Sequence, residues 1–167
     1  MPDTLPQAAD YPFRDQHQQH CQNAEVGAEQ LLTAFSSAAP AWAATLMAWR
    51  NRLAACFGLK TGPMQQAGTL SLQPGSHIGM FRIMHLGPQL AVLGEDDRHL
   101  DFRILLSVSP EAGGSRLQVE TWVRPHHWGG WLYLALVFPV HWLLSKLMLR
   151  TMAQRLGKSG PDAWLRR

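Results

Sequence analysis

The sequence predicts an α+β fold, in which an antiparallel sheet packs against a long C-terminal helix. Two segments near the N-terminus have helical periodicity, several later segments alternate apolar and polar residues, and a long apolar segment spans residues 128–156. Elements grouped in this order favour helices packed on one face of a sheet. With 167 residues, the chain suits a single domain over residues 1–167.

Two helices are expected before the sheet. Residues 24–36 place their larger apolar side chains near one helical face, with acidic residues early, where the helix dipole favours them. The second helix begins around Pro40 and is ended by Gly58. Its apolar stripe, at helical spacing, consists of Trp42, Leu46, Trp49 and Leu53. The polar residues 16–23 fit an exposed edge strand or an extended arm, and residues 1–10 are expected to be loose.

Four strands are predicted after these helices, over residues 79–86, 89–96, 98–109 and 115–124. Gly87-Pro88 separates the first two strands, and the segment PEAGGS separates the last two. Such short connections predict antiparallel pairing.

The last element, residues 128–156, is apolar almost all round in its first half. Trp128 to Leu149 is 22 residues, long enough to cross a bilayer. Pro139, His141 and Lys146 interrupt this segment, so a helix buried against the sheet is the favoured interpretation. A membrane-inserted or peripheral segment over residues 128–149 is the alternative. Pro139 is expected to kink the helix or to begin a new one.

The net charge of +3 is unevenly distributed. From His141 onward there are six basic residues and one acidic residue, +5 in all, which leaves −2 for residues 1–140. The basic tail, residues 157–167, fits a solvated helix end or contact with an anionic membrane surface. No strand with interleaved aromatic and basic residues supports nucleic-acid binding. The first twenty residues lack the pattern of a signal peptide, so a cytoplasmic location is expected.

The stretch GEDDRHLDFR, residues 94–103, holds four carboxylates, a histidine and two arginines. Alternation points Leu100, Phe102 and Ile104 toward the core and the charged residues toward the outer face of the sheet. Positions on one face lie about 7 Å apart, too far to clasp an ion without another ligand, so no metal site is predicted. We expect instead a salt-bridged outer face, with Arg116 and Glu120 as cross-strand partners. The outward set is Asp97, His99, Asp101 and Arg103.

Three blocks together are distinctive: PAWAATLMAWRNRLAACFGLK, GEDDRHLDFRILLSV and VRPHHWGGWLYLALVFPVHWLLSKLMLR. The chain resembles, over roughly residues 10–155, a bacterial family of uncharacterised proteins, the domain of unknown function 2867 family. Asn51 stands where that family usually has an acidic residue. The family is considered similar to the helix-grip superfamily, which includes START lipid-transfer domains, pollen allergens and polyketide cyclases. The resemblance implies a curved antiparallel sheet around the C-terminal helix, with an apolar cavity between them, and brings no established activity.

A few residues are candidates for lining such a cavity. His141 is either a hydrogen-bonded core histidine or a polar group in the pocket. Arg82 either meets an anion on the inner face or extends from an edge strand into solvent. In RPHHWGG, the adjacent His126 and His127 point in opposite directions in an extended chain and are not expected to chelate one ion. The predicted ligand-binding set is Arg82, Phe102, Trp131, Tyr133 and His141.

These features suggest three functions. The first is binding of a lipid-like or aromatic small molecule in the cavity, with affinity from apolar burial. The second is a cyclase- or hydratase-type enzyme in which His141 or another inward histidine acts as acid or base. The third is membrane attachment through residues 128–149 and the basic tail. No nucleophile motif or nucleotide-binding loop is present, and no cofactor, metal or catalytic residue is predicted. A monomer or homodimer is expected.

Overall fold

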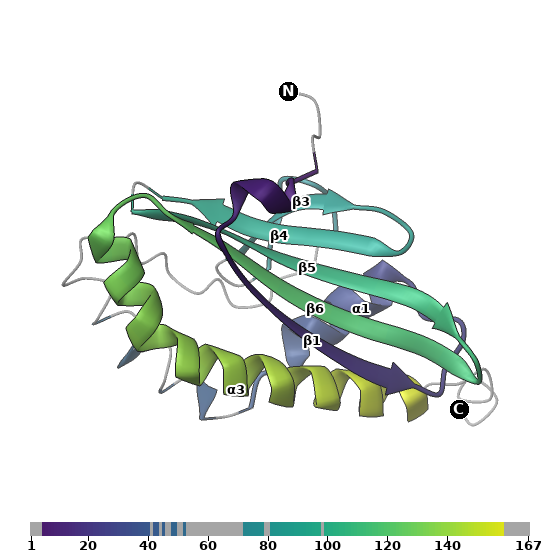
Figure 1. Cartoon of the computed structure of the whole chain (residues 1–167). Coiled ribbons are helices and arrows are strands. Elements are labelled where there is room, and N and C mark those ends of the chain that lie inside the picture. Colours follow the sequence, from purple (N-terminus) through teal and green to yellow (C-terminus); the bar gives the residue numbers. More distant parts are fainter. Residues whose placement is uncertain are drawn as a thin grey trace.

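The computed structural model describes residues 5–40, 42–43, 45, 48–49, 52, 72–78, 81–97 and 99–158. These residues form an α+β fold with one curved, six-stranded antiparallel sheet and helices on one of its faces (Figure 1). The strand order is β1-β6-β5-β4-β3-β2. The strands are β1 (Phe13–Cys21), β2 (His77–Ile78), β3 (Phe81–Leu86), β4 (Leu90–Asp96), β5 (Leu100–Glu111) and β6 (Gly114–Pro125).

Two α-helices, α1 (Ala28–Ser37) and α3 (Trp128–Lys158), cover the same face of the sheet, here called the inner face (Figure 1). α3 packs on β1 and β6, while α1 packs on α3, β4 and β5. The main core lies between these layers, because each element contributes its apolar side to it. Its fully buried side chains include Leu31 and Leu32 of α1, Leu93 of β4, Leu106 of β5, and Leu149 and Met152 of α3.

The four predicted strands are present, and a tight hairpin joins β5 to β6. β5 begins and ends two residues later than predicted, and β6 is one residue longer at each end. The short strand β2 was not predicted, because two residues show no alternation. Gly113, in the β5–β6 turn, has φ 77°, a left-handed conformation that glycine adopts without strain. The alternation in β5 is confirmed, since Ile104, Leu106 and Val108 join the inner core.

β1 is an edge strand, one of the two forms expected for residues 16–23, and it begins earlier, at Phe13. Its side chains alternate between exposed and half-buried positions. The register with β6 pairs Asp15 with Thr121 and His17 with Val119, so these residues share the inner face. The edge of the sheet on which α3 rests is therefore partly polar.

Most of the second predicted helix lies outside the described residues. Ala43, Thr45, Ala48, Trp49 and Arg52 are helical. Of the expected apolar stripe, Trp42 and Trp49 are 42% and 68% exposed, and Leu46 and Leu53 lie outside the described residues. Residues 159–167, most of the basic tail, also lie outside them.

The outer face of the sheet is partly covered by the chain that precedes β1. Residues 8–10, within the segment expected to be loose, form the short 3-10 helix η1 (Ala8–Asp10). Tyr11, next in the chain, is 5% exposed and packs on Trp122, with ring centroids 5.8 Å apart. Val92 and Leu105 complete this small second core.

Candidate functional site

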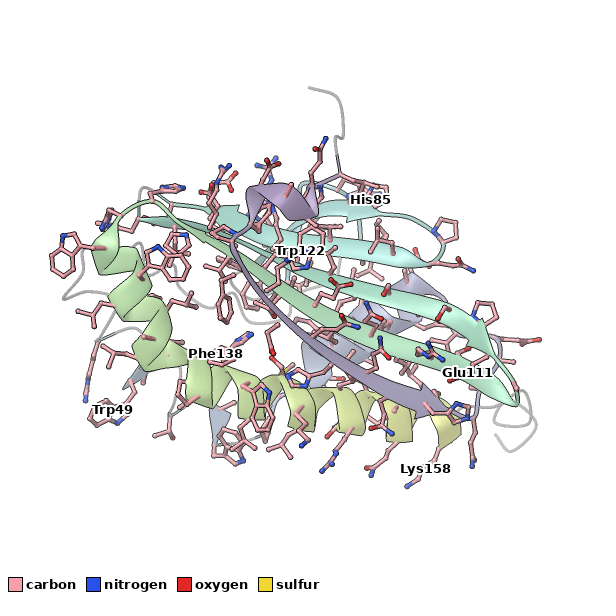
Figure 2. The ribbon with its side chains drawn as sticks, in the orientation of Figure 1. Trp49, His85, Glu111, Trp122, Phe138 and Lys158 are labelled. Carbon is pink, nitrogen blue, oxygen red and sulfur yellow. The ribbon has the colours of Figure 1, made fainter. Side chains whose placement is uncertain are left out.

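The N-terminal half of α3 rests on the sheet through an apolar cluster. Tyr133 is buried against Leu100 and Val123, and Phe138 packs edge-on against Phe13 with ring centroids 5.0 Å apart. Figure 2 shows Phe138 at the bend of α3, next to Pro139, the one proline inside the helix. The expected kink at this proline is therefore seen, and the helix continues through it to Lys158.

One turn beyond the bend, the contact between α3 and the sheet becomes polar. His141 Nε2 lies 3.0 Å from Thr121 Oγ1 on β6 and 3.3 Å from Ser145 Oγ on the next turn of α3. Burial lowers the pKa of His141 below its ordinary value, while the Asp15 carboxylate opposes this shift and His17 adds to it. The imidazole is therefore held in its neutral form at neutral pH. Of the two roles expected for His141, the contacts are those of a hydrogen-bonded interior histidine.

Asp15 and His17 of β1 extend this polar contact. Asp15 Oδ2 and His17 Nε2 are 3.0 Å apart, but neither atom meets the geometry of a hydrogen bond. The His17 ring also lies 5.7 Å from the ring of Trp142 on α3. We call Asp15, His17, Thr121, His141 and Ser145 the polar seam. It combines titratable and hydroxyl groups that come from three elements far apart in the sequence.

The five residues predicted to bind a ligand do not come together. Phe102 and Tyr133 lie on the inner face in the same apolar cluster, and His141 lies further along α3. Trp131 is 45% exposed. Arg82 is exposed, and it pairs in register with Gly94, which in turn pairs with Arg103. That row belongs to the outer face, so Arg82 and the pair Tyr133 and His141 lie on opposite faces of the sheet. The expectation that Arg82 meets an anion on the inner face is therefore wrong.

Asp101 and Arg103 of GEDDRHLDFR occupy the outer face, as alternation predicts, whereas Asp97 and His99 precede β5 and Glu95 pairs with Phe102 of the inner face. Asp101 is 4% exposed and accepts hydrogen bonds from Arg124 Nη2 at 2.6 Å and Nε at 3.1 Å. His126 Nε2 lies 3.0 Å from the same carboxylate. Burial alone raises the pKa of Asp101, but the bonds to Arg124 and His126 outweigh it, so the pKa of Asp101 is lowered.

The expectation that Arg116 and Glu120 are the cross-strand partners of this cluster is wrong. Arg116 pairs with Glu111 in the β5–β6 hairpin, and Glu120 accepts from the Trp122 indole at 2.8 Å. Arg103 instead pairs with Asp96 at 2.6 Å. The arginines of this cluster also approach Tyr11: its ring centroid lies 5.7 Å from the Arg103 guanidinium and 5.8 Å from that of Arg124. Asp96, Asp101, Arg103, Arg124 and Tyr11 thus form one cluster of ion pairs and cation–π contacts on the outer face.

The stretches GEDDRHLDFR and RPHHWGG meet where α3 begins. His99 Nδ1 lies 2.6 Å from His127 Nε2, and the Gly129 N–H donates to His127 Nδ1 at 3.1 Å. Since His127 Nδ1 accepts, its Nε2 carries the proton and donates to His99. His126 turns instead to Asp101, so the two adjacent histidines bind different partners. Across the described ranges, no three His, Cys, Asp or Glu side chains are grouped to hold a metal ion.

The side of α3 that faces away from the sheet is apolar and open to solvent. In the most apolar 18-residue window of α3, 17% of the residues are buried. The helix packs against the sheet, as expected, but through one side only. Figure 2 shows side chains along α3 projecting away from the sheet. We define the exposed face of α3 by its large apolar residues that are 40–78% exposed: Trp128, Trp131, Leu132, Leu136, Val140, Trp142 and Leu143.

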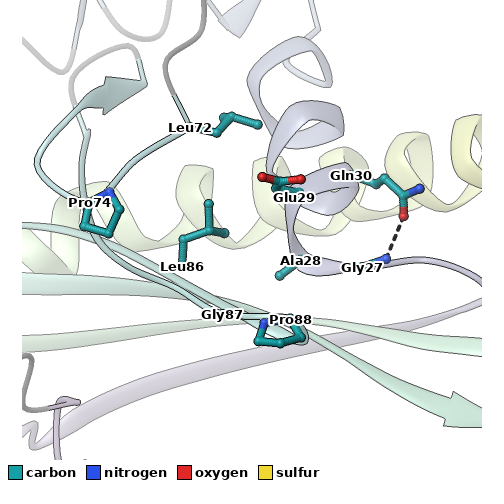
Figure 3. Close-up of a pocket in the computed structure, with 9 residues that line it drawn as sticks. All are labelled: Gly27, Ala28, Glu29, Gln30, Leu72, Pro74, Leu86, Gly87 and Pro88. Carbon is teal, nitrogen blue, oxygen red and sulfur yellow. Dashed lines mark hydrogen bonds between the residues drawn. The ribbon is translucent and has the colours of Figure 1, made fainter.

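A pocket of about 570 Å³ lies elsewhere, at the start of α1 (Figure 3). It is bounded by Gly27 to Gln30, by the β3–β4 turn at Leu86 to Pro88, and by Leu72 and Pro74. The Gln30 carboxamide accepts the Gly27 N–H at 2.7 Å, and the Pro88 carbonyl accepts the Ala28 N–H at 2.9 Å. The backbone donors of Gly27 and Ala28 at this end of α1 are thereby occupied.

A family model described as a protein of unknown function, DUF2867, matches residues 7–148. The chain belongs to the DUF2867 family. The matched range runs from the segment before β1 to the last third of α3, so it contains the polar seam and the exposed face of α3. No curated protein matches the chain. The description of the DUF2867 family names no activity.

Proposed function

We propose that this protein binds the surface of a lipid membrane through the exposed face of α3. The observation that carries this proposal is the solvent exposure of seven large apolar side chains on one helix, three of them tryptophans. Soluble proteins seldom expose a contiguous apolar surface of this kind unless it binds something. Tryptophan is also the side chain most enriched at the boundary between lipid and water.

The geometry favours a helix that lies along the membrane surface over one that crosses it. α3 is long and apolar enough to span a bilayer, but the side opposite the exposed face packs against the sheet and α1. Tyr133, Leu149 and Met152 are buried against the sheet or α1, and His141 bonds to Thr121. A spanning orientation would strip these contacts away and place the polar seam in hydrocarbon.

Co-sedimentation with phospholipid vesicles tests the proposal. Leu132→Gln/Leu136→Gln/Leu143→Gln removes three side chains that are 44–52% exposed, so stability stays within about 0.5 kcal/mol for each change. Moving the apolar surface of one leucine from water into lipid stabilises the bound state by about 1 kcal/mol. We therefore expect the affinity of the triple variant for vesicles to fall at least about tenfold.

The matched control for this experiment is a leucine of similar exposure outside α3. Leu5 is 45% exposed, so Leu5→Gln is compared with the single variant Leu136→Gln. Binding that is equally reduced by both changes, or by neither, would contradict the proposal.

We also propose, as a second function, that a lipid-like molecule binds beneath the sheet, as the likeness to helix-grip proteins implies. Half-buried aromatic rings support it: Phe81 packs edge-on against Phe102 at 5.6 Å and tilted against Phe35 at 6.2 Å. His141 would be the acid or base if such a ligand were also a substrate. Native mass spectrometry of protein purified from cells should then show a bound mass of lipid size, and a spectrum of the bare chain alone would count against this function.

A further inference from the structure

We propose that the surface bound by α3 is an anionic phospholipid bilayer, with Lys146 and Arg150 contacting the headgroup phosphates. This inference rests on the proposed membrane-binding function. It adds the chemistry of the partner, and it follows from where the charges of α3 lie relative to its apolar residues.

α3 has four basic residues, Lys146, Arg150, Arg155 and Lys158, and no acidic residue over residues 128–158. Helices that bind membrane surfaces gain affinity for anionic lipids from such cations, at about 1 kcal/mol per lysine or arginine near the surface. The helix dipole favours Arg155 and Lys158, which lie in the last turn, but it does not account for Lys146 and Arg150, which lie two or more turns before the end.

Two of these cations continue the exposed face. Lys146 follows Leu143 by three residues and Arg150 follows Lys146 by four, which keeps them on the same side of the helix. Lys146 Nζ lies 4.9 Å from the centroid of the Trp142 ring, at the border of the apolar surface. A lysine whose stem covers apolar surface while its ammonium reaches outward is arranged to meet phosphates above the acyl chains.

The other two cations are placed differently. Arg155 Nη1 donates to the Ser37 carbonyl at 2.8 Å and to the Ser37 hydroxyl at 3.0 Å, so it ties α3 to α1. Lys158 is exposed at the last residue of the helix. Lys146 and Arg150 are therefore the pair that accompanies the apolar residues into contact with lipid.

The apolar residues and the two cations follow one another along the helix axis. Trp128 to Leu143 spans about 22 Å at the rise of an α-helix, and the cations occupy the next two turns. Docking of this face places the tryptophans and leucines in the boundary between headgroups and acyl chains, with Lys146 and Arg150 at the level of the phosphates.

The test compares vesicles of phosphatidylcholine alone with vesicles that also contain phosphatidylserine. The variant Lys146→Gln/Arg150→Gln removes two charges from the docking surface. We expect its affinity for the anionic vesicles to fall roughly 10- to 30-fold, with little change on neutral vesicles. The wild-type preference for anionic vesicles should shrink at high ionic strength, because salt screens the attraction.

The matched control is Arg14→Gln/Arg82→Gln, which removes the same charge from exposed positions on the outer face of the sheet. This control should bind anionic vesicles as the wild type does. Equal losses in both double variants would show that net charge alone attracts the lipid, and would overturn the assignment of Lys146 and Arg150.

The remaining outcomes separate this inference from the proposed function. Wild-type binding that is equal on both vesicle types would overturn the anionic preference and leave membrane binding in place. No binding to either vesicle would overturn both. Analytical ultracentrifugation identifies a second copy of the chain as the alternative occupant: a stable dimer that Leu132→Gln/Leu136→Gln/Leu143→Gln dissociates would assign the exposed face to self-association instead.

Discussion

The protonation state of His141 is linked to the packing of α3 on the sheet. It is the titratable group of α3 that contacts β6, and its partners are hydroxyl groups. Asp15 and His17 on β1 are the other titratable groups of the polar seam. Burial favours the neutral imidazole, so protonation of His141 works against the folded state.

We predict that His141 makes the protein less stable in mild acid. Its pKa is lowered in the folded state from an unfolded value of 6.5, so its stabilisation is complete above that pH and is lost as the pH falls toward the folded pKa. Thermal unfolding between about pH 7.5 and pH 5.5 should show a decrease in Tm that His141→Gln makes shallower. His20, half-exposed beside Glu111, provides the control variant His20→Gln. An unchanged pH profile for His141→Gln would contradict the prediction.

Residue-level periodicity predicted which way the charged stretch faces, but not that its charges are buried. Asp101 and Arg103 point outward, as expected, and yet they are 4% and 9% exposed. Tyr11, about ninety positions earlier in the chain, packs against Arg103, while Arg124 and His126 bond to Asp101. Alternation reports the face of a strand, and it carries no information about what another segment lays over that face.

At the scale of the element, the start of α3 depends on a close approach of two backbones. A Cβ atom on Gly130 would lie 2.6 Å from the carbonyl oxygen of His99. That oxygen is held in place, since it accepts the His126 N–H at 2.9 Å. The neighbouring Gly129 differs, because its Cβ would meet only the side chain of His127, at 3.0 Å.

We therefore predict unequal losses of stability for two adjacent glycine-to-alanine changes. Gly130→Ala should lower the free energy of unfolding by about 1–3 kcal/mol, because the clash with His99 outweighs the gain in helix propensity. Gly129→Ala should cost less than about 1 kcal/mol, because the His127 ring can shift where a backbone carbonyl cannot, although the shift weakens its bonds to Gly129 and His99. Chemical denaturation of both variants measures the difference, and equal effects would be incompatible with the close approach at Gly130.

The helix itself was predictable, but the side that it buries was not. Residues 128–156 are apolar almost all round, so periodicity could identify a long helix without indicating a face. The structure shows that α3 rests on the edge strand β1 and on β6. A helix at the edge of a sheet is covered on one side only, which explains why its apolar residues remain exposed.

At the scale of the whole molecule, the fold class and the family followed from the sequence, whereas the proposed binding surface did not. The order of helices and strands predicted the α+β arrangement, and the match over residues 7–148 confirms the family. The predicted ligand set assumed a cavity that would gather Arg82, Trp131 and His141. Arg82 points outward because it alternates with the buried Ile83 in β3. The positions of Trp131 and His141 follow from the edge position of α3, which non-local contacts set.

The pairing of β1 with β6 has a consequence for how the chain folds. Gln18 and Gln118 bond across this pair although 100 residues separate them. Closing so long a loop costs entropy before any contact compensates for it, so this step should be late and slow. During synthesis, β1 cannot pair with β6 until the chain has been made as far as Pro125. Until β1 pairs with β6, α3 lacks one of the two strands on which it packs. More of its apolar surface is then exposed, and chaperones or a nearby bilayer can bind it during this interval.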